Sequence, residues 1–195
     1  MRLKIVSMGE PVLRARSNAL SINQLLGPKV QGLIDHMRET VRDAPGVGLA
    51  APQVGESIRL AVIEDRGEYH KTLSEAELRE RDRREVPFHV IVNPVIELHG
   101  EVTEKFFEGC LSLPGYTALV PRAREVRVTC LDHRGEPRVI EATGWYARIL
   151  QHEIDHLYGT LYVDRMDAHS LSTLDNYTRH WKNSGKNSVN SGILT

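Results

Sequence analysis

The stretch His152-Glu153-Ile154-Asp155-His156 places two imidazole side chains four positions apart. On an α-helix, positions i and i+4 differ by about 40° in azimuth and about 6 Å in height. His152 and His156 therefore point the same way and can share one metal ion, while Glu153 can reach a water on that ion. This is the H-E-x-x-H pattern, which indicates hydrolysis by a metal-activated water.

The residues around this motif predict a buried helix over 144–158. Thr143 suits the N-cap position, and Gly159 suits the position at which a helix ends. Apolar side chains cover much of the helix circumference, which is typical of a helix inside a core. Burying two histidines and two acids on such a helix is costly unless they are paired or bind metal. The context of the motif therefore strengthens the metal-site interpretation.

Composition excludes several classes of function. A chain of 195 residues with 41% hydrophobic and 26% charged residues fits one globular domain. The net charge of −1 gives no strong attraction to nucleic acid or to an anionic membrane, so neither is expected as a partner. No apolar run is long enough to span a bilayer, and the first residues carry no signal or transit pattern. Two cysteines suggest a reducing compartment.

The remaining pattern predicts an α+β fold. An amphipathic helix is expected over 28–43. The charge-rich segment 64–86 is expected to be a solvated surface insertion with a short helix, and the tail after Trp181 is expected to be disordered. We expect antiparallel strands packed around the central motif helix, over residues 59–64, 88–93, 95–98, 125–132 and 138–142.

A catalytic metal site of this type needs a third protein ligand and one open coordination position. A third histidine ten residues after His152 is absent, because that position is Tyr162, and no glutamate follows Glu153. A downstream aspartate remains open and would indicate an aspartate-ligated metalloprotease. The candidates are Asp164, Asp167 and Asp175.

An upstream cysteine is the other possibility for the third ligand. Cys130 lies on the apolar face of an alternating strand, which is the usual pattern of a buried thiol. Cys110 lies in the turn-like segment Glu108-Gly109-Cys110-Leu111-Ser112, which Pro114 and Gly115 follow. A thiol in such a turn is better placed to present its sulfur to an ion, so Cys110 is favoured over Cys130.

Three segments now stand in one order along the chain: Gly46 to Gln53, Glu108 to Ser112, and Gln151 to His156. Together they resemble the three signature motifs of the peptide deformylase family, and the likeness continues through 116–122 and 144–150. It covers roughly residues 3 to 167. The resemblance implies a metallo-amidase that hydrolyses the N-formyl group from the formyl-methionine of newly made polypeptides and releases formate. The longer insertion resembles the subgroup that includes organellar as well as many bacterial members.

Carried onto the matching positions, the resemblance also implies roles for individual residues. Glu153 would be the general base and acid, while the side-chain amide of Gln53 and the backbone N–H of Leu111 would hold the oxyanion. The implied ligands of one divalent ion, natively Fe²⁺ and replaceable by Zn²⁺, Ni²⁺ or Co²⁺, are Cys110, His152 and His156. The implied substrate-binding residues are Val47, Gly48, Phe106, Gly109, Trp145, Arg148 and Ile149.

The expected organisation is a catalytic domain over 1–170 and a C-terminal extension over 171–195 that is at least partly disordered. The implied partners are N-formylated nascent peptides and, transiently, the ribosome, which some relatives are thought to contact through a basic C-terminal helix. The tail here offers only Arg179, Lys182 and Lys186 for that contact. The implied location is the bacterial cytoplasm, or the stroma or matrix of an organelle. Beside the metalloprotease, a non-catalytic module in which a metal stabilises a peptide-binding fold remains an alternative.

Overall fold

The computed structural model describes residues 1–44 and 46–182 and has the α+β class that the sequence predicts. None of the helices in these two ranges combines the length and the apolar character needed to cross a membrane. Short 3₁₀ turns occur at Pro11–Arg14, Ala51–Val54, Tyr162–Asp164 and Ala168–Ser170. The helices are α1 (Ile22–Leu26), α2 (Pro28–Asp43), α3 (Gly67–His70), α4 (Glu75–Glu80), α5 (Gly144–Leu157) and α6 (Leu174–His180). The strands are β1 (Gly48–Ala50), β2 (Leu60–Asp65), β3 (Val86–Glu108), β4 (Tyr116–Leu131), β5 (Pro137–Thr143) and β6 (Ser172–Thr173).

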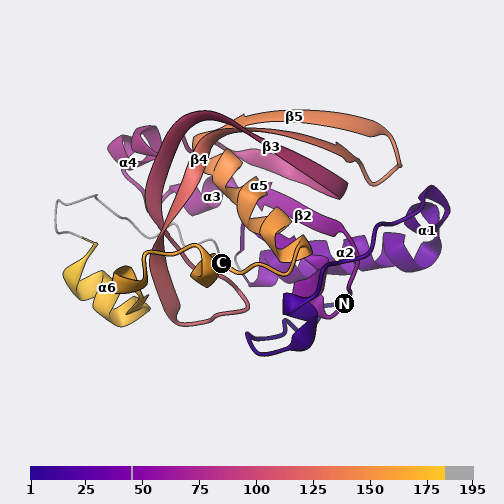
Figure 1. The fold of residues 1–195 in the computed structure, drawn as a ribbon, viewed down its shortest axis with the longest axis horizontal. Coiled ribbons are helices and arrows are strands. Elements are labelled where there is room, and N and C mark those ends of the chain that lie inside the picture. The colour runs from indigo at the N-terminus through magenta and orange to yellow at the C-terminus, as the bar shows by residue number, and fades with distance from the viewer. Residues whose placement is uncertain (45, 183–195) are drawn as a thin grey trace.

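The strands pair antiparallel in the order β1-β2-β3-β4-β5, and β6 pairs with the start of β4. The first half of β3 pairs with β2, and the rest of β3 pairs with β4. The sequence predicts two strands separated at Pro94, whereas the structure has one strand over 86–108. Asn93 takes a φ of 49° and the register shifts between Val92 and Val95, so a local irregularity accommodates the proline. The long strands of the sheet curve around α5 (Figure 1).

Helix α5 occupies the position that its sequence predicts, with almost every residue buried. Its apolar side chains share one core with residues of β2, β4 and β5. Gly159, with a φ of 75°, follows the helix as the sequence predicts. Thr143 occupies the predicted N-cap position, although its side chain makes no capping bond within the helix. Its hydroxyl instead donates to Asp82 Oδ2 at 2.6 Å, which ties the start of α5 to the charged insertion.

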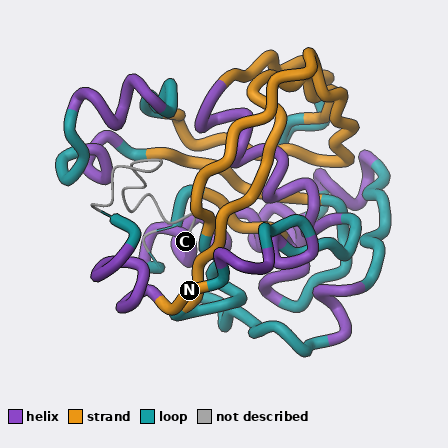
Figure 2. The backbone as a smooth tube through the Cα atoms, turned by 60° about the vertical axis from the view of Figure 1, so that its left-hand side comes forward, coloured by secondary structure: helices purple, strands orange, loops and turns teal. Residues whose placement is uncertain are grey.

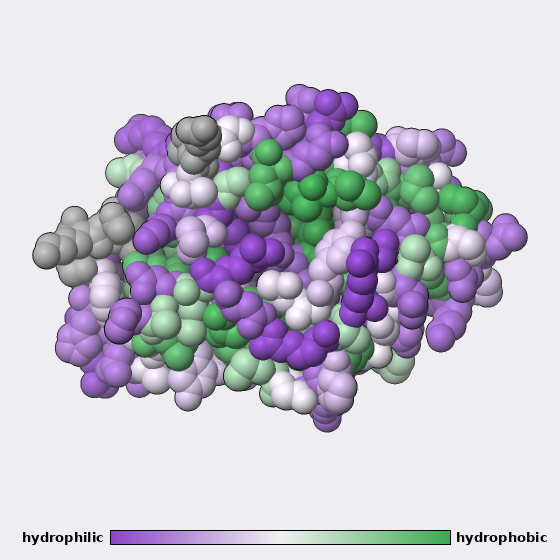
Figure 3. Space-filling model, viewed as in Figure 1, coloured by the Kyte–Doolittle hydropathy of each residue, from purple (hydrophilic) through white to green (hydrophobic). Residues whose placement is uncertain are grey.

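Helix α2 has the predicted bounds and covers a second core cluster. Its buried side chains pack against apolar residues of β1, β2 and the first half of β3. In the view of Figure 2, two long paired strands run side by side across the front of the molecule. The face drawn in Figure 3 is largely hydrophilic and is interrupted by hydrophobic patches. The buried residues that α2 contributes are Val30, Ile34, Met37, Thr40 and Val41.

The charged insertion contains α3 and α4, so one short helix was too few. The prediction of a solvated segment is also wrong at its end, because Arg81 is 1% exposed and Arg83 is 6% exposed. Both guanidinium groups lie over the indole ring of Trp145. The predicted disorder of the tail falls largely on residues 183–195, which lie outside the described residues.

Candidate metal centre

Two segments far apart in the sequence meet beside α5. Cys110 lies two residues after the end of β3, in a turn where the carbonyl of Cys110 accepts a bond from Leu113 N–H at 2.9 Å. The carbonyl of Ser112 in the same turn accepts a bond from Met8 N–H at 2.8 Å, which fixes the turn to the N-terminal segment. The second segment is the 3₁₀ turn after β1, which carries Gln53.

Cys110, His152 and His156 offer one ligand atom each, and these three atoms lie within 4.8 Å of one another. All three residues are buried, and Cys110 Sγ lies 3.3 Å from Nε2 of His156. In the part of the chain that the structure describes, this is the only such group of three. Three protein ligands with room for a fourth partner are the donor set of a catalytic site rather than of a closed structural one. The residues therefore fit a bound divalent metal ion.

A buried carboxylate fixes the orientation of the first imidazole. Nδ1 of His152 lies 3.0 Å from Oε2 of Glu108, so Nδ1 donates to the carboxylate and Nε2 is left for a metal. Glu108 also accepts bonds from Arg122 at 2.9 Å and from Arg148 at 2.6 Å. Burial alone would raise the pKa of Glu108, but Arg122, His152 and Arg148 outweigh it and hold this pKa well below its ordinary value. Glu108 is thus an anion that anchors the ligand helix.

The network continues through Asp155, the fourth residue of the motif. Arg122 donates to Asp155 Oδ2 at 2.5 Å, and Arg165 donates to both oxygens of Asp155 at 2.7 Å. This pairing explains why an aspartate is tolerated on a buried helix. Sequence reasoning assigned no role to Glu108, Arg122 or Asp155. The sequence did carry a signal, because Glu108 and Asp155 are acids within two of the three motifs. An acid at a buried position needs a partner.

Glu153 lies beside the ligands and differs from Glu108 in forming few hydrogen bonds. Its side chain is 3% exposed, and its Oε2 has no hydrogen-bond partner among the described residues. Burial raises the pKa of Glu153 to about 7. A Cβ atom on Gly48 would lie 2.6 Å from Cδ of Glu153, so glycine at this position leaves the space that the carboxylate fills.

Gln53 is oriented toward the cluster by its neighbours. Its Oε1 accepts a bond from Ala50 N–H at 2.8 Å, and its Nε2 donates to Ser112 Oγ at 3.4 Å. The same Nε2 lies 3.5 Å from Cys110 Sγ. Leu111 follows Cys110 in the turn and is half-buried. Both residues thus stand next to the metal ligands.

The predicted substrate-binding residues come from β1 and the residue before it, from the end of β3 and the turn after it, and from α5. Gly48 begins β1, which is an edge strand of the described sheet, and Val47 directly precedes it. Phe106 and Trp145 form an edge-to-face pair, with ring centroids 6.1 Å apart. Arg148 is 2% exposed and donates to the carbonyl oxygens of Val120 and Glu104 as well as to Glu108. Gly109 and Ile149 are also buried.

The three aspartates that the sequence left open have other roles. Asp164 pairs with Arg14 and accepts a bond from Leu161 N–H at 2.8 Å. Asp167 caps the 3₁₀ turn at Ala168–Ser170, and Asp175 is exposed in the first turn of α6. None of them belongs to the metal-ligand group found among the described residues. The geometry therefore favours the cysteine over an aspartate as third ligand.

Comparison with known proteins assigns the family. The family model described as polypeptide deformylase matches residues 2–171. The chain belongs to the polypeptide deformylase family. Peptide deformylase 3 of Streptomyces avermitilis is 46% identical over 180 residues, which cover 92% of this chain and 78% of that relative.

Similar members of the polypeptide deformylase family include a plant protein and a bacterial protein of known structure. The chloroplastic peptide deformylase 1A of Solanum lycopersicum is 45% identical over 88% of this chain, but the match covers 62% of that relative. The chain thus spans less than two thirds of the plant relative's length. The Met-Ala-Ser-bound crystal structure of a class I type b peptide deformylase from Acinetobacter baumannii superposes with a TM-score of 0.75 at 34% identity. That superposition covers 85% of this chain and 99% of the other.

Proposed function

We propose that this chain is a metal-dependent amidase that removes the N-formyl group from the N-terminal formyl-methionine of newly synthesised polypeptides and releases formate. The observation that carries the proposal is a buried Cys-His-His cluster beside the carboxylate of Glu153, whose Oε2 has no partner among the described residues. A purely structural metal site has no use for an acid at this position. Family membership supports the same reaction.

The proposed ligands are Cys110, His152 and His156. When bound there, a divalent ion would lower the pKa of a water to about 7 and polarise a carbonyl oxygen. We infer Fe²⁺ as the native ion and Zn²⁺, Ni²⁺ or Co²⁺ as substitutes, because one thiolate and two imidazoles suit these metals. Since the thiolate beside iron(II) is oxidisable, activity should decay in air.

Glu153 is the proposed proton carrier. Its carboxylate takes one proton from the attacking water and gives that proton to the nitrogen of the departing amine. The C–N bond of the formamide breaks, the new C–O bond completes formate, and the peptide leaves with a free amino terminus. Burial raises the pKa of this carboxyl group above its ordinary value, which favours uptake of the proton at neutral pH.

Gln53 and Leu111 are the proposed donors to the oxygen on which negative charge develops. The side-chain amide of Gln53 is already held by the bond between its Oε1 and Ala50 N–H, so its N–H groups need little reorientation. The backbone N–H of Leu111 follows directly after the ligand Cys110. Each donor of this kind contributes about 100- to 1000-fold in rate.

The edge strand and the aromatic pair are proposed to bind the substrate. An extended peptide would add to the free edge of β1 at Val47 and Gly48, through main-chain bonds that ignore its side chains. The first side chain would enter an apolar pocket between Phe106 and Trp145. The similar Acinetobacter baumannii protein binds Met-Ala-Ser, which has the form of a deformylated product. We propose Gly109, Arg148 and Ile149 as further residues of this site.

The setting in the cell is also a proposal. The relatives include bacterial proteins and a chloroplastic one, so we place the enzyme in the bacterial cytoplasm or in the stroma or matrix of an organelle. There it would meet nascent chains and, transiently, the ribosome. We assign catalysis to residues 1–170 and regard 171–195 as an extension.

The experiment is formate release from formyl-Met-Ala-Ser by anaerobically purified protein, with metal analysis of the same sample. The wild type should release formate and hold about one ion per chain. Glu153→Gln should keep the metal and lose most of its turnover, while Cys110→Ala should lose both metal and turnover. Full turnover by Glu153→Gln would exclude the proposed mechanism, and full metal retention by Cys110→Ala would exclude the proposed ligand set.

A further inference from the structure

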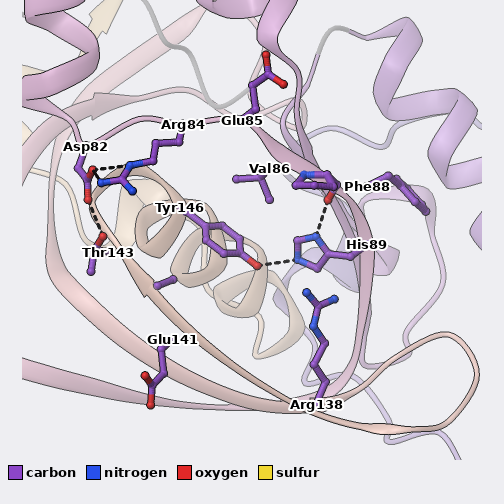
Figure 4. Close-up of a pocket in the computed structure, with 12 residues that line it drawn as sticks. Asp82, Arg84, Glu85, Val86, Phe88, His89, Arg138, Glu141, Thr143 and Tyr146 are labelled. Carbon is purple, nitrogen blue, oxygen red and sulfur yellow. Dashed lines mark hydrogen bonds and ion pairs between the residues drawn. The ribbon is translucent and has the colours of Figure 1, made fainter.

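The end of the charged insertion docks closely onto the start of α5. The carbonyl of Arg81 accepts a bond from Trp145 N–H at 2.8 Å, and Asp82 accepts a bond from the hydroxyl of Thr143. Figure 4 shows this Asp82 to Thr143 contact, together with the Asp82 to Arg84 pair. A Cβ atom on Gly144 would lie 2.6 Å from Cβ of Asp82, so the two backbones are nearly in contact. This segment is therefore a fixed part of the core.

The side chain of Arg81 reaches the aromatic pair of Phe106 and Trp145. Its guanidinium carbon lies 4.8 Å from the ring centre of Trp145 and 5.5 Å from that of Phe106. Arg81 is the one residue of the insertion whose guanidinium lies over both rings in the described part of the chain. Burial and the nearby Arg83 lower the pKa of Arg81 to about 10, so it stays charged at neutral pH. A cation over a desolvated aromatic face is among the stronger contacts of this type.

The neighbouring arginine holds this arrangement in place. Arg83 lies 5.3 Å from the ring centre of Trp145 and donates to both oxygens of Asp65 at 2.8 and 2.9 Å. Because Asp65 ends β2 and is 1% exposed, the insertion is anchored to the sheet at the same level as the indole ring. Trp145 is thereby contacted from the insertion. It is also contacted from α5 itself, where the guanidinium carbon of Arg148 lies 5.9 Å from the ring centre of Trp145.

We propose that Arg81 is a positioning residue that fixes the shape of the pocket for the first side chain of the substrate and so determines selectivity for methionine. The inference rests on the proposed function, in which Phe106 and Trp145 line that pocket. The guanidinium of Arg81 packs against both rings, so its removal would leave the indole free to tilt. A wider pocket would discriminate less between the thioether side chain of methionine and the larger ring of phenylalanine, because selectivity in apolar pockets depends on fit.

The test compares kcat/KM for formyl-Met-Ala-Ser and formyl-Phe-Ala-Ser in the metal-loaded full chain. In Arg81→Ala the ratio of the two values should fall by about tenfold or more, chiefly through a higher KM for the methionine substrate. Arg81→Met, which keeps a long side chain over the rings, should retain a ratio closer to that of the wild type. If Arg81→Ala does not fold, Arg81→Val takes its place, because its short side chain does not reach over both rings.

Arg84→Ala is the matched control. Arg84 lies three residues further along, its side chain is 83% exposed, and it pairs with Asp82. This variant should keep the wild-type ratio. A wild type that releases no formate from either peptide contradicts the proposed function itself. An active wild type with Arg81 variants that lose activity equally on both peptides, or not at all, overturns the role of Arg81 alone.

Discussion

Gly48→Ala tests whether the position of the Glu153 carboxylate controls the reaction. A Cβ atom at residue 48 would lie 2.6 Å from Cδ and 2.7 Å from Cγ of Glu153. Ordinary contacts between such atoms are about 3.5 Å or longer, so the carboxyl group must move by about 1 Å. A displacement of that size at a reacting group costs about 100-fold in rate. We therefore expect kcat/KM to fall by about two orders of magnitude.

Stability should respond far less than activity. Overpacking of one methyl group costs about 1–3 kcal/mol. In a chain of this size each kcal/mol shifts Tm by about 2–4 °C, so the expected loss is about 2–12 °C. Metal content should remain at the wild-type level, because the three atoms nearest to the added Cβ all belong to Glu153 and none to a metal ligand. The assay is formate release at saturating metal, with calorimetry and metal analysis on the same preparation.

Gly32→Ala provides the control for this substitution. Gly32 lies in α2, and a Cβ atom there would meet nothing within 4 Å. Alanine in a helix interior is favoured over glycine by about 1 kcal/mol, so this variant should be as active as the wild type and slightly more stable. Wild-type activity in Gly48→Ala would refute the reasoning, because it would mean that Glu153 need not occupy its present position.

Two further predictions concern buried groups. Glu108→Gln leaves Arg122 and Arg148 without their shared anion, at a cost of about 3–5 kcal/mol, so calorimetry should show a Tm lower by roughly 6–20 °C. Metal affinity should fall by about 10- to 100-fold in the same variant, because the imidazole of His152 loses its orienting acceptor. An unchanged Tm and affinity would mean that the network has no anchoring role. Separately, burial raises the pKa of Cys130 to about 11. The native protein at about pH 8 should therefore resist alkylation at Cys130, whereas the unfolded chain reacts, and mass spectrometry of peptides after iodoacetamide treatment distinguishes the two outcomes.

The sequence was most informative where a short periodic pattern controls the geometry. The four-residue spacing of His152 and His156 requires only a helix, and α5 provides it. The turn that bears Cys110 was recognisable from its glycine and proline residues. The strand boundaries were less accurate, because Pro94 suggested an interruption that Asn93 absorbs by a left-handed conformation. The start of β4 at Tyr116 was also missed.

The burial of Arg81 and Arg83 could not be predicted from sequence. A run of alternating charges is normally solvated, and nothing local distinguishes these two arginines from the exposed Arg79 and Arg84. Their partners lie on β2 and α5, up to 64 positions away in the chain, since Trp145 contacts Arg81. Contacts of this kind become visible only when the tertiary structure brings the elements together.

The edge position of β1 has a consequence for inhibition. A molecule that lay along this strand as an extended peptide would be held by amide groups, and amide groups are identical in every residue except proline. Replacing a side chain cannot remove them, and at Gly48 even one added methyl group would disturb the acid that the enzyme needs. Resistance to such a compound would therefore have few routes through single substitutions on this strand.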